Sequence, residues 1–147
     1  MDLIIKLFTG YLVGVTAGVT LEVPRNLLNK NGISGLLGYG VYLILLDRMP
    51  KQIATFLACS FITLLAHFLA RRYKAPVSLF IIPPFFIFVP GSSIYQTALH
   101  FIQGETATSA KFFVETLTLA GSIALGVFVI DSFLESFFYI QKRYFNR

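Results

Sequence analysis

The sequence predicts an all-α protein: a polytopic membrane bundle of about five transmembrane helices whose fourth helix is broken by a Pro-Gly pair. Three observations lead to this prediction. The chain of 147 residues is 56% hydrophobic and only 13% charged, which is far more apolar than a soluble domain of this length. Long apolar runs follow one another along the chain with only short polar joints. Pro90 and Gly91 interrupt one of these runs.

The apolar runs leave no linker long enough to separate domains, so residues 1–147 are expected to form a single integral membrane domain. A helix of about 20 residues crosses a hydrocarbon core of about 30 Å. Only the second run falls well short of this length. It either extends through Lys30, thins the bilayer or is re-entrant. The runs are, roughly, Leu3 to Leu21, Gly32 to Leu46, Ile53 to Ala70, Val77 to Ile102 and Phe113 to Ile140.

The first run carries Gly10, Gly14 and Gly18 at four-residue spacing. This spacing is typical of a helix surface that another helix approaches closely, so we interpret these glycines as packing residues. No small-residue cleavage site follows the run, and we therefore expect a retained span instead of a removed signal.

Basic residues cluster at the ends of the apolar runs, where they set membrane orientation. The net charge of +5 therefore does not indicate nucleic-acid binding, and the expected surroundings are membrane lipids. With five crossings, most of the 12 Lys and Arg residues fall on one side, which predicts a cytoplasmic C-terminus and an N-terminus outside. The residues on the richer side are Arg25, Lys30, Arg71, Arg72, Lys74, Lys142, Arg143 and Arg147.

The fourth run is expected to restart as a new helix near mid-membrane. Pro90 lacks an N–H group and Gly91 tolerates unusual dihedral angles, so free N–H groups and a positive dipole end would lie there. Such a terminus suits a carboxylate, as in transporters with broken helices. Ser92 or Ser93 would cap the helix or contact the ligand. The alternative is a simple proline kink whose serines bond back to their own helix.

A helix that restarts after Gly91 places four polar side chains on one face, at i, i+3, i+4 and i+7. A polar face at membrane depth cannot face lipid, so it should line a path or contact another subunit. Tyr95 lies in the same segment. The expected substrate pathway is therefore Pro90, Gly91, Ser92, Ser93, Tyr95, Gln96, Thr97 and His100.

The fifth run holds Asp131 and Glu135, one turn apart on one face. Ionisable groups within a membrane are functional candidates, so this pair is a candidate for proton coupling. Alternatively, both groups lie at the interface, solvated or paired with Lys142 or Arg143. A second, weakly polar face in this run, where a substrate exit would lie, comprises Glu115, Thr118, Ser122 and Gly126.

Catalysis finds no support in the sequence. His67 and His100 stand isolated, and no cluster has metal-ligand spacing. Neither a Gly-rich phosphate loop nor a serine nucleophile elbow is present. The single cysteine, Cys59, cannot form an intramolecular disulfide. We therefore expect no metal, no cofactor and no enzymatic activity.

Two motifs carry a resemblance to a known family. Val23-Pro24-Arg25, followed by Leu27-Leu28 and Gly35-Leu36-Leu37-Gly38, looks like one family segment. Pro84 with Val89-Pro90-Gly91-Ser92-Ser93-Ile94-Tyr95 looks like its central Pro-Gly-x-x-x-Tyr element. On these motifs nearly the whole chain resembles the threonine/serine exporter family, in the five-helix form that is the small subunit of a two-component exporter.

The resemblance implies an exporter of the bacterial cytoplasmic membrane that works with a larger subunit of the same family. It also implies a small carboxylate substrate: threonine and serine, or dicarboxylates such as succinate. Glu22 departs from the neutral polar residue typical of relatives, which argues against a ligand role for its loop. A homo-oligomer remains open. The alternative function is a non-transporting assembly subunit that scaffolds a larger transport partner.

Overall fold

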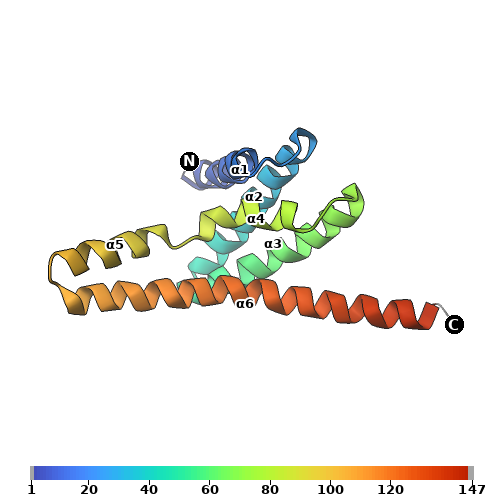
Figure 1. Cartoon of the computed structure of the whole chain (residues 1–147). Helices are drawn as coiled ribbons and strands as arrows, with labels where there is room; N and C mark the ends of the chain where they lie inside the picture. Colours follow the sequence, from blue (N-terminus) through green and yellow to red (C-terminus); the bar gives the residue numbers. More distant parts are fainter. Residues whose placement is uncertain (1, 146–147) are drawn as a thin grey trace.

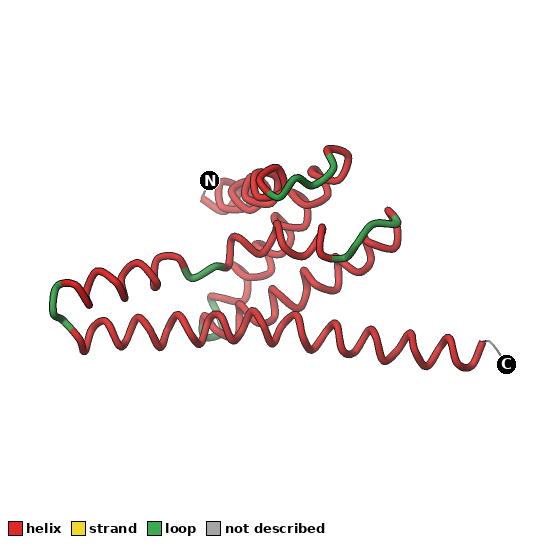
Figure 2. The backbone as a smooth tube through the Cα atoms, in the orientation of Figure 1, coloured by secondary structure: helices red, strands yellow, loops and turns green. Residues whose placement is uncertain are grey.

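A computed structural model describes the backbone of residues 2–145 and the side chains of residues 3–136. This part of the chain is helical throughout, with short connecting loops (Figures 1 and 2). The all-α prediction is therefore confirmed. The elements are α1 (Asp2–Thr20), α2 (Arg25–Leu46), α3 (Lys51–Tyr73), α4 (Ser78–Phe85), the 3-10 turn η1 (Phe86–Phe88), α5 (Gly91–Ile102) and α6 (Thr106–Phe145).

Within the described residues, three helices are long and apolar enough to cross a membrane, and a bent pair makes a fourth if it is counted as one span. α2 is not among them, although its 22 residues reach about 33 Å. Of the alternatives for the short second run, the helix extends through Lys30. Its ammonium group lies 5.5 Å from the centre of the Tyr73 ring, which keeps the charge on the surface of the bundle.

α1 packs along α2 at the glycines predicted for helix packing. A Cβ atom added to Gly10 would lie 2.9 Å from the carbonyl oxygen of Gly35, and one added to Gly14 would overlap the carbonyl of Asn31. A Cβ at Gly18 would meet the Leu28 side chain at 2.9 Å. The two backbones come this close only because these positions lack side chains.

The fourth apolar run is broken at Pro90, and a new helix begins at Gly91, as the sequence predicts. α4 and η1 form one arm and α5 the other, and the two are bent by 49°. Pro83 and Pro84 already weaken the first arm, since neither can donate the usual hydrogen bond to the carbonyl four residues earlier. At the break, Pro90 forms a tight turn (φ −76°, ψ 52°) in which the Gly91 N–H bonds the Val89 carbonyl at 2.8 Å.

Gly91 tolerates unusual dihedral angles, but it does not adopt a positive φ. Among the described glycines only Gly104, in the turn between α5 and α6, has a positive φ, of 79°. The proline turn alone redirects the chain, so the break does not depend on the conformational freedom of glycine.

α3 and α6 run parallel in a constant register. Lys51 pairs with Glu115 and His67 with Asp131, and each pair is separated by 64 residues. Between the pairs the helices approach closely, since a Cβ at Gly126 would lie 2.8 Å from a backbone oxygen of α3. Parallel α3 and α6 mean that α4 and α5 together carry the chain back to the end where α3 began, as one broken span would.

α5 folds back on the first half of α6, and this hairpin projects beyond α1–α4 (Figure 1). From Thr106 to Glu115, which lies level with Lys51, α6 covers about 14 Å. The side chains of the hairpin that face outward are mostly apolar, including Phe101 (68% exposed) and Ile102 (82% exposed). Along the axis of α6, Lys51 therefore lies about 14 Å from the tip of the hairpin.

Candidate functional site

The helix break borders a small polar pocket of about 180 Å³. Four separate segments contribute to it: the middle of α2, the start of α3, the break itself and α6. Its polar groups are one ammonium group and four hydroxyl groups, and the rest of the wall is apolar. The lining residues are Tyr39, Tyr42, Lys51, Thr55, Ile87, Phe88, Val89, Pro90, Ser92 and Leu119.

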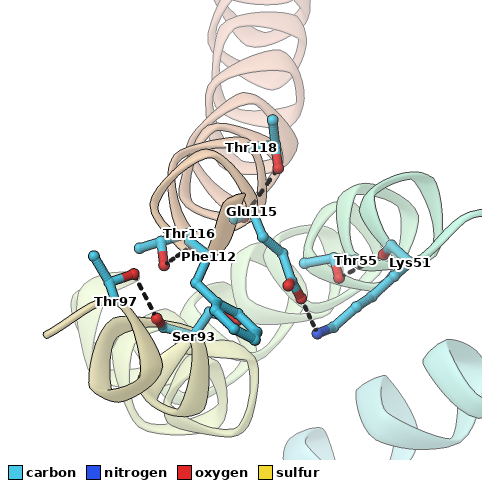
Figure 3. A network of polar contacts seen from close by, with 8 residues as sticks. All are labelled: Lys51, Thr55, Ser93, Thr97, Phe112, Glu115, Thr116 and Thr118. Carbon is cyan, nitrogen blue, oxygen red and sulfur yellow. Dashed lines mark hydrogen bonds and ion pairs between the residues drawn. The ribbon is translucent and has the colours of Figure 1, made fainter. Parts of the chain in front are cut away.

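The charged group of the pocket is Lys51, the first residue of α3. Its Nζ donates to Oε1 of Glu115 at 2.8 Å (Figure 3). Both side chains remain partly accessible, at 45% and 32%. Ser93, which is 4% exposed, also interacts with the Glu115 carboxylate. A cation and an anion thus stand side by side at the pocket, and a bound molecule could compete for either.

The N-terminus of α5 faces the same region. The residue that precedes the helix is Pro90, and no side chain caps this end, so the capping expected from Ser92 or Ser93 is not observed. The Ile94 N–H closes the first helical turn by bonding the Pro90 carbonyl at 3.0 Å. The earlier N–H groups of a helix have no intrahelical partner, and they carry the positive end of the dipole. Ser92 brings this end into the pocket wall.

The predicted polar face of α5 is turned toward α6. Ser93 is buried, and Gln96, Thr97 and His100 are half-buried. Tyr95 is 62% exposed and lies outside this face. Only the Ser93 end of the face reaches the Lys51–Glu115 pair.

Much of the remaining polar face holds the α5–α6 hairpin together. Ser109 Oγ of α6 donates to the Thr97 carbonyl of α5 at 2.8 Å, whereas Thr97 Oγ1 donates to the Ser93 carbonyl within α5 at 2.7 Å. His100 lies 2.8 Å from Glu105 and stacks on Phe112. Part of this face is therefore structural.

Comparison with models of protein families places the site in context. The family described as Threonine/Serine exporter, ThrE, matches residues 6–133, which include both the pocket and the broken helix. The chain belongs to this family. The resemblance inferred from the motifs is thus confirmed, and the protein is a component of an exporter-type membrane transporter. No curated protein and no solved structure matches the chain.

In this exporter-family chain, the expectation that both histidines are isolated was wrong. His100 contacts Glu105, and His67 Nε2 lies 2.6 Å from Asp131 Oδ1 across the α3–α6 seam. Helix periodicity within one segment could not reveal either contact. Glu135, one turn beyond Asp131, is exposed. The alternative pairing with Lys142 or Arg143 falls outside the described side chains.

The weakly polar face predicted in the fifth run is divided. Glu115 bonds Lys51, which lines the pocket, whereas Gly126 packs on α3. Thr118 and Ser122 bond carbonyls of their own helix. Among the residues whose side chains are described, no group of three or more His, Cys, Asp or Glu could hold a metal ion.

Sequence reasoning missed the residues that line the pocket opposite the break. Lys51 was given no role beyond the general one of basic residues at the ends of apolar runs, and Tyr39, Tyr42 and Thr55 were given none. One feature of the sequence pointed to Lys51, since it opens an apolar run directly after Pro50. The tyrosines, three residues apart in the second run, share a helix face. Neither feature says which distant helix they meet.

Proposed function

We propose that this protein is the small membrane subunit of a secondary exporter that carries threonine, serine or a small dicarboxylate such as succinate out across the bacterial cytoplasmic membrane. Its C-terminus lies in the cytoplasm, and it works with a larger subunit of the same family. The observation that carries this proposal is the pocket at the helix break, where Lys51 and the N-terminus of α5 converge.

The chemistry of the pocket supports a small carboxylate. An ammonium group and a helix N-terminus both attract an anion, and the hydroxyl groups of Tyr39, Tyr42 and Thr55 offer further hydrogen bonds. The volume of about 180 Å³ compares with about 30 Å³ for one liquid water, so it suits a molecule the size of a small amino acid.

The adjacent carboxylate favours an amino acid over a dicarboxylate. The substrate carboxylate would replace Glu115 as the partner of Lys51, and the released Glu115 would attract the substrate ammonium group. A dicarboxylate would place its second negative charge near Glu115 instead, which is unfavourable. Serine and threonine are therefore the first substrates to test.

The test measures efflux of preloaded, labelled serine, threonine and succinate from cells that express this chain, the larger subunit, or both. We expect efflux only from the pair. The Lys51→Gln variant should lower that efflux by tenfold or more, since it removes the charge that holds the substrate, at a cost of roughly 1.5–3 kcal/mol. Lys6→Gln, an exposed lysine of α1, is the matched control. Equal efflux from Lys51→Gln and Lys6→Gln at matched expression would rule out the site.

The assembly subunit remains the second candidate function, because the hairpin offers a docking surface. A groove of about 680 Å³ with an almost entirely apolar lining runs between α5 and α6, where a helix of the larger subunit would fit. If the protein is an assembly subunit, Lys51→Gln leaves efflux from cells that express both subunits unchanged, whereas polar substitutions in the groove abolish it. Efflux from this chain alone would instead indicate a self-sufficient homo-oligomer. The groove residues are Ile94, Thr97, Ala98, Phe101, Thr106, Ser109, Ala110, Phe113 and Thr116.

A further inference from the structure

A second pair of titratable groups joins α3 and α6 far from the pocket. His67 Nε2 and Asp131 Oδ1 lie 2.6 Å apart, with 18% and 39% of their side chains exposed. On each helix the pair lies 16 residues beyond Lys51–Glu115, or about 24 Å. The α3–α6 seam is thus held by one ion pair beside the pocket and by a His–Asp pair toward its other end.

The gain or loss of one proton changes the net charge of the pair, and the neighbouring charges on α3 and α6 offset each other. Arg71 lies one turn beyond His67 on α3, and Glu135 lies one turn beyond Asp131 on α6, so the next turn contributes one charge of each sign. α4, which packs on α3, contains no titratable residue. In α2, the charges at this end of the bundle are Arg25 and Lys30, and Lys30 lies against Tyr73.

We propose that His67 and Asp131 form the proton site that couples export to the proton gradient, by closing the α3–α6 seam when protonated and releasing it when deprotonated. This inference rests on the proposed exporter function. It assigns the role to Asp131 with His67, in place of the Asp131 and Glu135 pair predicted from the sequence.

The physical reason lies in the net charge of the two states. With the proton bound, imidazolium and carboxylate attract each other and the pair is neutral overall. Without the proton, the carboxylate keeps a full negative charge beside a neutral ring. An uncompensated charge within a membrane is costly and recruits water, which favours separation of the helices at this end. Histidine is the side chain that ordinarily changes charge between about pH 5 and 8.

The proton balance of the cycle follows from these states. When the pocket end of the seam opens outward and releases the substrate, water in the pathway protonates the pair. When that end closes, the pair loses the same proton to cytoplasmic water, its end of the seam opens, and a new substrate enters. One proton moves inward for each substrate that moves outward.

A distance measurement tests the closure directly. Spin labels replace Phe68 and Phe133, two exposed residues beside the pair, in a Cys59→Ala background. Labels at Ile53 and Leu117, beside Lys51 and Glu115, are the matched control. We expect the first distance to lengthen as the pH rises from about 5 to about 8, and the Ile53–Leu117 distance not to lengthen, because the pocket end closes when the end that holds the pair opens. In Asp131→Asn the first distance should no longer depend on pH. A pH-independent first distance in the wild-type pair, or an unchanged response in Asp131→Asn, would overturn the inference.

Flux in proteoliposomes, reconstituted with the larger subunit, separates this inference from the proposed function. Asp131→Asn should keep substrate exchange without a gradient but lose roughly tenfold or more of the stimulation by a pH gradient. A merely structural pair would lower exchange and stimulation in parallel. A wild type that exchanges substrate without responding to the pH gradient would overturn the inference alone. A pH-dependent seam in a protein that moves no substrate would support the proton site and count against the exporter.

Discussion

At the scale of single residues, Asn31 shows how a polar side chain compensates for a proline in a neighbouring helix. It is fully buried in α2, and its Nδ2 donates to the Leu79 carbonyl at 2.9 Å. That carbonyl would normally accept from the residue four positions later, which is Pro83 and has no N–H. The amide thus satisfies a backbone oxygen that the proline leaves without its helical donor.

Replacing Asn31 by Ala should therefore destabilise the protein by about 1–3 kcal/mol, because a buried carbonyl loses its donor. The measurement is the midpoint of thermal aggregation in detergent, compared with Asn26→Ala at an exposed position of the same helix. Equal midpoints for the two variants would show that the Leu79 carbonyl finds another donor.

The charge of Glu115 should determine the discrimination between amino acids and dicarboxylates. In Glu115→Gln the repulsion of a second substrate carboxylate is removed, so the ratio of succinate to serine efflux should rise roughly fivefold to tenfold, or about 1–1.4 kcal/mol. Glu105→Gln, at the tip of the hairpin, serves as the control. A ratio that does not change would place the substrate away from this carboxylate.

At the scale of elements, two pairs of helices approach each other closely at glycines: α1 with α2, and α3 with α6. A Cβ at Gly14 would overlap the backbone of α2, and one at Gly126 would crowd that of α3. By contrast, a Cβ at Gly121 would meet no neighbouring atom within 4 Å, so this glycine lies in open space on α6. Four-residue spacing identified the first contact, whereas Gly126 emerged only from the register of α3 and α6.

Gly14→Ala should thus weaken the α1–α2 contact, since the backbone of α2 would have to move, whereas Gly121→Ala should be neutral or slightly stabilising. Thermal aggregation and the yield of folded protein in detergent measure both effects. A Gly14→Ala variant as stable as Gly121→Ala would mean that α1 shifts on α2 without cost.

At the scale of the whole molecule, the parallel course of α3 and α6 fixes which loops share an end of the bundle. The turn after α2 and the hairpin tip lie at one end, and the turns after α1 and α3 lie at the other. This arrangement needs α4 and α5 to act as one broken crossing. A re-entrant loop would instead return the chain to the end where α3 finishes and make α6 antiparallel to α3.

Cysteine labelling checks this topology in intact cells, with Cys59 replaced by Ala. We expect a membrane-impermeant reagent to label Arg48→Cys and Gln103→Cys, but not Glu22→Cys or Lys74→Cys, all four being exposed positions. If Arg48→Cys and Gln103→Cys label on opposite sides, the α4–α5 segment does not cross.

The sequence by itself determined the features that depend on neighbours along the chain. Hydropathy identified the apolar helices, Pro90 located the main break, and helical periodicity placed Ser93, Gln96 and His100 on one face. Only the tertiary structure decided that Lys51 meets Glu115 and that His67 meets Asp131. These contacts depend on the register between two helices that are 64 residues apart, and that register arises from packing across the seam, including the close approach at Gly126. No periodicity within either helix encodes it.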